Sequence, residues 1–453
     1  MSSINNTIKM LLLGTLLFPA AACNKEWLEA KPDKSLLLPV TVKDYQALLE
    51  NYSVLSRSFV ILGECTTDDT YLPYNTWLSL SEEERNIYVW AKDPYTANDV
   101  TSWNATWQAV LNSNVALEGI EKVAVTTVNE KDWRSVKGQA LAQRAFSFFN
   151  LTQVFCRQYD PQTAATDLGI PLKLSADINE PVQRSTLQQT YDRITGDLET
   201  AKTLLPDIQP VRGRPSSVGV AGLLARIYLS MGRYADAYRN ADEYLQHTNT
   251  LIDYNTVNGT RSYPFTALNE EVSWHCELSS TTMLGNRSGL VDTLLYRSYS
   301  DNDLRKTLFY TTGGVLFRGM YTGFRNYLFC GIATDEQYLI RAECLARTGR
   351  INDAMEDLRT LLEKRYLPNT YVSPVVNDET AALQVILAER RKELYLRGVR
   401  WSDLRRLNLD PRFQVTLKRI LDGQEYTLPP NDNRYTFPIP KGEIDISGIA
   451  QNP

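Results

Sequence analysis

Apolar residues recur every three to four positions over most of the chain, and this spacing predicts a mainly helical protein. A stripe from Val42 to Leu55 predicts one helix near the N-terminus. The helix that begins near Leu187 is expected to end at Leu205, because Pro206 cannot continue it. The strongest stripes predict pairs of helices near residues 103–156, 187–247, 334–366 and 379–409.

Two of these segments have the pattern of tetratricopeptide repeats. Residues 221–245 place small and apolar side chains at the offsets that let two helices approach closely around a turn glycine, here Gly232. Residues 338–365 match more weakly, with Gly349 at the turn. The two glycines are 117 residues apart, whereas a tandem array repeats about every 34 residues. We therefore expect interrupted repeats.

The segments between the stripes are irregular. Residues 248–333 interrupt the repeats and are rich in Tyr, Thr, Ser, Asn and Gly. A long irregular insert inside a helical scaffold is usually functional or disordered, and its many aromatic residues favour an ordered one. Residues 71–90 combine aromatic and acidic residues without a sustained period, which predicts a surface loop. The tail from Tyr435 onward is expected to be extended.

The N-terminus predicts export and a lipid anchor. A short apolar run follows Lys9, and it fits the h-region of a secretory signal because a membrane span needs about 20 apolar residues. The small residues before Cys23 are similar to a bacterial lipobox, although Ala20 stands where Leu is usual. We expect residues 1–22 to be removed, residues 23–453 to form a single domain, and Cys23 to carry acyl chains that anchor it to a membrane. Plain secretion is the alternative.

Composition narrows the classes of function. The chain has 48 basic and 53 acidic residues and a net charge of −5, which argues against a nucleic-acid partner. It has two histidines and six scattered cysteines without a C-x-x-C pair, so we expect neither a metal nor a cofactor. The motifs G-x-S-x-G, H-E-x-x-H and G-x-x-x-x-G-K are absent, and the commoner motif-bearing enzyme classes therefore lack support.

Several short motifs follow one another in a set order along nearly the whole chain. They are the Cys23 start, Arg144–Leu151, Gly169-Ile-Pro-Leu172, Gly213-Arg-Pro-Ser216, Glu389–Leu394, Gly398–Arg406, Phe437-Pro-Ile-Pro440 and Gln451-Asn-Pro453. Each motif is modest alone. In this order and spacing, however, the chain resembles the SusD/RagB family of outer-membrane nutrient-binding lipoproteins from Bacteroidetes.

The resemblance implies a mostly α fold, in which tetratricopeptide-like helical pairs form a curved scaffold and loops build a ligand-binding face. It implies a lipid-anchored protein on the cell surface that captures oligosaccharides, or peptides in some members. It also implies that the protein passes its ligand to a SusC-like TonB-dependent outer-membrane transporter. No catalysis is implied.

Aromatic residues outside the helical stripes are the candidates for ligand contact, because the C–H faces of sugar rings pack on flat aromatic surfaces. Members of the family place ligand contacts in these two irregular regions, but no motif fixes the positions, and burial in the core is the alternative for each residue. The candidates are Tyr71, Tyr74 and Trp77 in the first region, and Trp274, Tyr296, Tyr299 and Tyr321 in the insert.

Three further features have plainer interpretations. Acids are interleaved with the bases of the arginine-rich stretch 390–406, which favours pairing on a helix surface over an anion site. Trp107, Phe148 and Trp401 lie on apolar stripes and are expected in the core. The acidic clusters are expected to be solvated, with Asp301 or Asp303 as a possible helix cap; they are Asp68-Asp69, Glu82–Glu84 and Asp301 with Asp303.

Two other functions stay open from the sequence. Tetratricopeptide surfaces often hold peptides or partner subunits, so a protein-interaction scaffold is one alternative. A surface glycoside hydrolase is a remote alternative, because a glycosidase needs two carboxylates that face each other across a cleft, and sequence cannot show such a pair.

Overall fold

The structure is a computed structural model that describes residues 39–279, 281–284, 288–314 and 316–453. The chain divides into two units, residues 1–40 and residues 41–453, and the second unit is described below. Cys23 and the predicted signal segment lie outside the described residues, so lipid attachment stays a prediction. In the part of the chain that is described, no helix has both the length and the apolar character that crossing a membrane requires.

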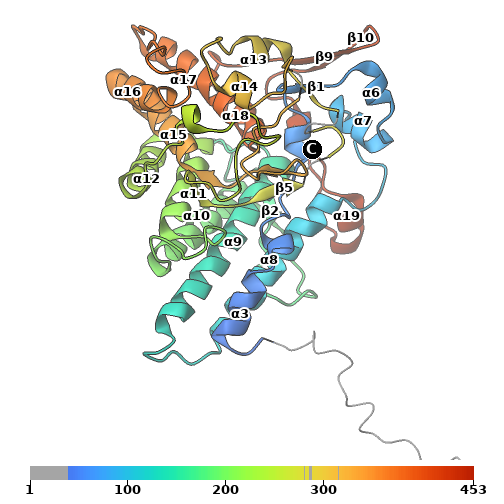
Figure 1. Cartoon of the computed structure of the whole chain (residues 1–453). Coiled ribbons are helices and arrows are strands. Elements are labelled where there is room, and N and C mark those ends of the chain that lie inside the picture. The colour runs from blue at the N-terminus through green and yellow to red at the C-terminus, as the bar shows by residue number, and fades with distance from the viewer. Residues whose placement is uncertain (1–38, 280, 285–287, 315) are drawn as a thin grey trace, which may run out of the picture. The chain divides into compact units, whose positions relative to one another are not determined.

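Long helices build the scaffold of the second unit, as the stripes predict (Figure 1). Consecutive helices pack side by side from α8 to α12, α12 packs on α15, and both α16 and α17 pack on α15. The bounds are α8 Thr101–Ile120, α9 Glu130–Phe155, α10 Leu187–Leu204, α11 Ser217–Ser230, α12 Tyr234–His247, α15 Thr334–Arg347, α16 Ile351–Leu362, α17 Glu379–Glu393 and α18 Arg400–Leu407. The mostly α fold is confirmed.

Local sequence sets the ends of these helices. Thr186 caps α10 in a capping box with Gln189, and the helix stops before Pro206 as expected. Gly232 and Gly349 have φ angles of 71° and 80°, so each supplies the left-handed residue at the turn of a helical pair. The pairs α11–α12 and α15–α16 therefore have the turns that the repeat pattern predicts.

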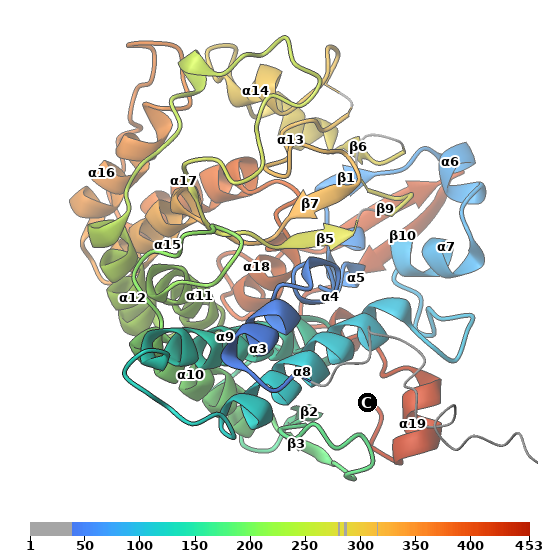
Figure 2. The same cartoon turned by 60° about the horizontal axis from the view of Figure 1, so that its bottom comes forward.

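The two tetratricopeptide-like pairs are separated in sequence but adjacent in space. Helix α12 of the first pair packs directly against α15 of the second (Figure 2). Arg341 on α15 joins three helices, since its guanidinium lies 2.8 Å from Asp242 on α12 and 2.7 Å from Asp357 on α16. The insert therefore leaves the helical array after α12 and returns at α15 without breaking the stack.

The insert is irregular, as predicted, and short antiparallel strand pairs tie it to the rest of the unit. Strand β4 pairs with β8, β5 with β7, and β6 with β1, which comes from the first third of the chain. The elements are β1 Thr70–Tyr71, η2 Tyr254–Thr256, β4 Val272–Trp274, β5 Glu277–Ser279, β6 Leu290–Val291, α13 Thr293–Arg297, α14 Arg305–Leu308, β7 Tyr327–Phe329 and β8 Ile332–Ala333.

The structure corrects three local predictions. The single helix expected over residues 42–55 is two helices, and the surface loop expected over residues 71–90 contains two more. The tail is not simply extended, because a short helix follows Pro440. The elements involved are α3 Val42–Leu49, α4 Tyr52–Leu55, α6 Tyr74–Leu78, α7 Glu82–Tyr88, η3 Asn433–Tyr435 and α19 Lys441–Ser447.

Further short elements complete the unit. Helix α5, Leu62–Cys65, lies between α4 and β1 in the sequence. Strands β2, Leu168–Pro171, and β3, Arg184–Thr186, pair with each other, as do β9, Leu417–Leu421, and β10, Gln424–Leu428. The apolar residues predicted for the core are inside: Phe148 and Trp401 are buried, and Trp107 packs against the same core.

Candidate functional site

Two of the predicted ligand contacts form a stacked pair of aromatic rings on the surface. Tyr74 and Trp77 lie three residues apart on α6, their ring centroids are 5.9 Å apart, and their planes differ by 29°. Tyr74 is 37% exposed and Trp77 is half-buried. The indole nitrogen of Trp77 donates to the carbonyl of Arg85, 3.3 Å away, which fixes the ring. We call Tyr74 and Trp77 the α6 ring pair.

The segment that carries the α6 ring pair is fastened at both ends. Before α6, Tyr71 lies in β1 opposite Leu290 of β6 and is 38% exposed. The amide of Leu72 donates to the hydroxyl of Tyr88 at the end of α7, 2.7 Å away. The β1–β6 pair thus joins the first predicted ligand region to the insert, which holds the second.

Tyr296 follows β6 on the short helix α13 and is half-buried. Its ring lies edge-on to that of Tyr310, with centroids 5.5 Å apart, and the ammonium group of Lys306 lies 5.7 Å from its ring centre. Tyr71, Tyr74, Trp77 and Tyr296 keep exposed surface, and their role in ligand contact stays a prediction.

Three of the predicted contacts are inside the protein, so the expectation of an exposed platform is wrong for them. Trp274 is completely buried and packs edge-on against Phe146. The hydroxyl of Tyr299 donates to the carbonyl of Lys392, and that of Tyr321 donates to Glu271, each over less than 3 Å. These side chains hold the insert on the helical scaffold and have no ring face free for a ligand.

A second exposed ring pair was not among the predicted contacts. Phe324 is 50% exposed, and its ring centroid lies 6.2 Å from that of half-buried Tyr327 at the start of β7. The guanidinium of Arg57 covers Tyr327 at 3.9 Å. Both residues belong to the aromatic run of the insert, but nothing in an irregular segment shows which of its rings point outward.

The acidic cluster next to β1, Asp68 and Asp69, holds this part of the chain on two arginines. Arg400 lies 2.7 Å from Asp68, and Arg391 lies 2.7 Å from Asp69. Burial alone would raise the pKa of Asp68, but the guanidinium groups of Arg400 and Arg391 lower it below its usual value. Burial raises the pKa of Asp69 above its usual value, although both arginines oppose the shift. Both carboxylates are therefore ion-paired with arginines.

The other acidic clusters have similar explanations. Asp303 is buried against Arg305, 2.7 Å away, whereas Asp301 is exposed and pairs with Lys306 at the same distance. Neither is the cap of α14, which begins after Leu304, although Asp303 accepts from the amide of Arg305. Glu82–Glu84 form the first turn of α7, where Glu84 completes a capping box with Ser81.

The arginine-rich stretch is structural, as predicted, but its partners are mostly distant in sequence. Arg390 pairs with Asp403, Arg397 with Asp335, and Arg406 with Glu343, over 2.6–3.0 Å. All three arginines are buried. The stretch therefore ties α17 and α18 into the core. The predicted pairing along a helix is present in Glu389–Lys392 and Asp403–Arg406, but these residues are buried and do not form a solvated helix surface.

Histidine and cysteine give no sign of metal or redox chemistry in the described part of the chain. His275 is buried and bonded to Glu277, and Cys65, Cys156, Cys276, Cys330 and Cys344 are free and buried. Burial raises the pKa of the Cys156 thiol to about 11. Among the described residues, no three His, Cys, Asp or Glu side chains are grouped as a metal site would require.

Comparisons with known proteins agree with this architecture. Residues 26–229 match a family described as starch-binding and associating with the outer membrane, and residues 334–453 match the SusD family. The chain belongs to the SusD/RagB family. The insert lies between the two matched regions, so Tyr296 and Phe324 belong to a part of the chain that neither of these two matches covers.

Individual members of the family support the assignment. A SusD-like protein, P2, from Formosa agariphila is 23% identical in an alignment that covers 68% of this chain and 72% of that protein. A SusD superfamily protein from Bacteroides thetaiotaomicron has 24% identity and a TM-score of 0.75, covering 91% of this chain and all of the other. A laminarin-binding SusD-like protein has 19% identity and a TM-score of 0.64, covering 90% and 97%. The SusD-like fold is thereby confirmed.

Proposed function

We propose that this protein is a lipid-anchored, surface-exposed binding protein that captures oligosaccharides and passes them to a SusC-like TonB-dependent transporter in the outer membrane. The observation that carries the proposal is the α6 ring pair, two stacked aromatic rings on the surface of a chain from a carbohydrate-binding family. A stacked tyrosine and tryptophan offer a flat apolar face with polar edges, which suits a sugar ring.

The architecture around the α6 ring pair fits capture without chemistry. Two acids that precede it in the sequence, Asp68 and Asp69, are engaged by arginines and are not available as an acid and a base. A shallow surface pair also suits a ligand that must be released to a transporter. The protein would therefore bind and hand over its ligand unchanged, and a glycoside hydrolase is the least favoured alternative.

Binding is tested with the soluble protein, residues 24–453, against a panel of starch, laminarin and other soluble polysaccharides, with a peptide library in parallel. Trp77→Ala and Tyr74→Ala are each expected to weaken binding of the recognised glycan at least about tenfold, because loss of an aromatic anchor costs roughly 1.4 kcal/mol or more. Tyr238→Ala on α12 is the matched control; Figure 1 places α12 on the other side of the unit from α6.

The possible outcomes separate the function from the site. Binding that is lost in Phe324→Ala but kept in Trp77→Ala would move the site to the second ring pair and leave the function standing. Binding of peptides alone would favour the peptide-binding alternative. Turnover of a bound glycan would overturn the proposal in favour of a hydrolase.

The anchor and the transporter are tested in cells. Radiolabelled palmitate is expected to label the wild-type protein, and Cys23→Ala is expected to release the protein from the membrane fraction. A β-barrel transporter is expected to copurify with the wild-type protein after mild detergent extraction. A wild-type protein that is soluble without detergent would contradict the anchor, and the absence of a copurifying barrel would favour a different partner.

A further inference from the structure

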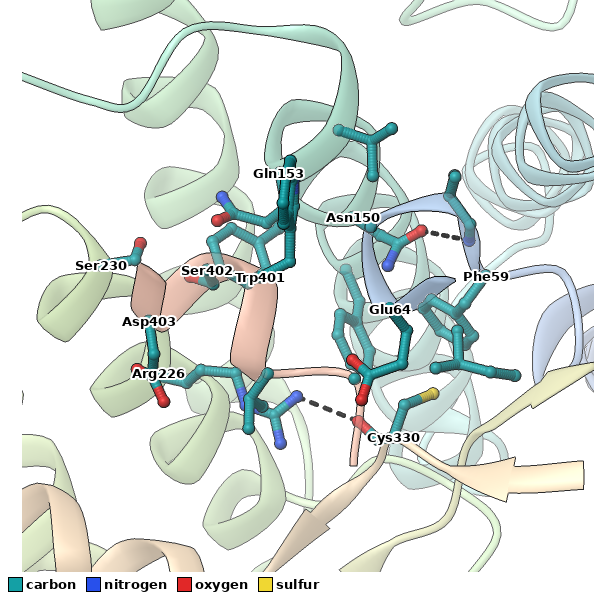
Figure 3. Close-up of a pocket in the computed structure, with 18 of the residues that line it drawn as sticks. Phe59, Glu64, Asn150, Gln153, Arg226, Ser230, Cys330, Trp401, Ser402 and Asp403 are labelled. Carbon is teal, nitrogen blue, oxygen red and sulfur yellow. Dashed lines mark hydrogen bonds between the residues drawn. The ribbon is translucent and has the colours of Figure 1, made fainter. Parts of the chain in front are cut away.

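A small cavity lies inside the unit, between α5, α9, α11 and α18 (Figure 3). Its volume is about 40 Å³. Part of its wall is apolar, with Phe59, Phe149 and Trp401, but Glu64, Gln153 and Arg390 also line it. Glu64 belongs to α5 and is only 3% exposed, and Figure 3 shows its carboxyl group inside the cavity.

The polar side chains of this cavity hold atoms that are left without hydrogen-bond partners. Both carboxyl oxygens of Glu64 are buried and unpartnered, as are Gln153 Oε1, Arg390 Nη1 and Trp401 Nε1. The other polar atoms of these residues are used: Gln153 Nε2 donates to the hydroxyl of Tyr191, and Arg390 Nε donates to Asp403. Buried polar atoms are nearly always hydrogen-bonded, so this concentration in one cavity calls for a ligand.

The charges around Glu64 determine whether its carboxyl group is ionised or neutral. The three arginines that line the cavity each have a carboxylate partner: Arg226 pairs with Glu336, Arg390 with Asp403, and Arg406 with Glu343, over 2.6–2.8 Å. Glu64 is a further acid in this group, in addition to the three carboxylates that pair with these arginines. The other charged groups that act on it are Arg400, which is engaged by Asp68, and the acids Asp68, Asp69 and Asp403.

The unpartnered atoms also decide the class of ligand. A metal ion or ammonium needs acceptors on every side, but Arg390 Nη1 and Trp401 Nε1 are hydrogen-bond donors. Water both donates and accepts, and a buried water needs roughly 10–15 Å³ of such volume and two to four polar partners. A cavity of about 40 Å³ with donors and acceptors on its wall therefore fits about three water molecules.

We propose that this cavity is an internal hydration site, in which two or three water molecules link a neutral Glu64 carboxyl group to Gln153, Arg390 and Trp401. A neutral Glu64 carboxyl group donates one hydrogen bond and accepts others, so that through these waters the unpartnered polar atoms of the cavity wall gain hydrogen bonds. An ionised Glu64 would add a fourth negative charge to three arginines that are already paired.

The charge state is tested on the full soluble protein by its stability against pH. Burial, followed by the nearby Asp69 charge, raises the pKa of Glu64 to about 8. A carboxyl group whose pKa is higher in the folded state stabilises below its unfolded pKa and loses this contribution as pH rises. From about pH 5 to 8, the unfolding constant of the wild type is expected to rise by up to about tenfold per pH unit relative to Glu64→Gln.

Two more measurements complete the test. The infrared spectrum of the wild type at pH 6 is expected to show the C=O stretch of a protonated carboxyl that Glu64→Gln lacks, and a high-resolution crystal structure is expected to show ordered water within hydrogen-bond distance of Glu64. Equal pH profiles, a missing carboxyl band or a dry cavity would overturn the proposal. A different result would favour a bound cation and overturn the proposal: the wild type would be more stable in Na⁺ than in choline at equal ionic strength, and Glu64→Gln would abolish this difference. If Glu64→Gln fails to fold, the wild-type spectrum with ¹³C-labelled glutamate and the crystal structure still decide.

Discussion

Arg365 is predicted to be the residue on which the attachment of the insert to the helical scaffold depends most. Its side chain is completely buried, with Nε 2.7 Å from Glu393 on α17 and Nη2 2.8 Å from Glu271 just before β4. Its Nη1 donates to the carbonyl of Ile252, and its guanidinium lies 4.0 Å from the ring centre of Tyr254. One cation thus neutralises two buried acids and joins the insert to α17.

Arg365→Ala is expected to lower the free energy of unfolding by about 3–5 kcal/mol, the usual cost of leaving a buried charge without its partner. The loss is partial because Glu393 keeps Arg305 at 3.0 Å, and Glu271 keeps the Tyr321 hydroxyl at 2.7 Å. Arg359→Ala on α16 is the matched control. Arg359 also bridges two acids, Glu356 and Glu363, but it is 43% exposed, so its loss is expected to leave the free energy of unfolding nearly unchanged.

The assay is urea unfolding followed by circular dichroism, with hydrogen exchange to locate the change. Exchange is expected to rise in the insert of Arg365→Ala before it rises in α8–α12. Burial raises the pKa of Glu271 to about 7 with Arg365 present, and removing this cation should raise the pKa further. The variant is therefore expected to lose less stability at pH 5.5 than at pH 8. Equal losses in the two variants, or a larger loss at low pH, would refute this reasoning.

Two other changes test packing and anchoring. Gly222→Ala on α11 should lower the free energy of unfolding, measured by thermal unfolding, by about 1–3 kcal/mol, because the added methyl would lie 2.5 Å from Ile332. In the control Gly196→Ala on α10, the added methyl meets nothing within 4 Å, and the free energy of unfolding should rise by roughly 0.5–1 kcal/mol. Arg419→Ala should make the β9–β10 hairpin sensitive to proteolysis, because the buried Arg419 guanidinium donates to the carbonyls of Tyr88 and Thr67; Lys418→Ala, which is exposed, should not. Equal effects within either pair would contradict the explanation.

The helical scaffold could be predicted because its periodicity is long and its turns carry specific residues. Helices α8 to α12 each hold three or more turns of a repeating apolar stripe, and Gly232 and Gly349 mark the turns of the repeats. The sequence could not show that α12 and α15 are neighbours, because nothing local specifies which helix the chain meets after an insert of more than 80 residues.

Shorter elements were missed because they are too short for a period. Helices α6 and α7 have five and seven residues, although Ser81 followed by Glu84 is the signature of a capping box and could have indicated α7. The β9–β10 hairpin turns at Asp422-Gly423, both with positive φ, and this dipeptide is a strong hairpin signal. Helix α7 and the β9–β10 hairpin could therefore have been predicted from their capping and turn residues, although not from the hydrophobic pattern.

The candidate site could be predicted only as a region. The aromatic residues of the two regions have different roles: Trp274, Tyr299 and Tyr321 fasten the insert from inside, whereas Tyr74, Trp77 and Phe324 keep exposed surface. In a helix or strand the period tells the two kinds apart, but an irregular segment has no period. The burial of its rings follows from tertiary packing alone.

The buried arginines connect the scaffold to the proposed binding surface. Arg391 on α17 and Arg400 on α18 hold Asp68 and Asp69, and two residues later the chain reaches Tyr71 and then the α6 ring pair. A surface that is ordered before it meets its ligand loses less conformational entropy on binding. These acids and arginines, which lie more than 300 residues apart in the sequence, are therefore best understood as one clamp that keeps the rings of α6 in place.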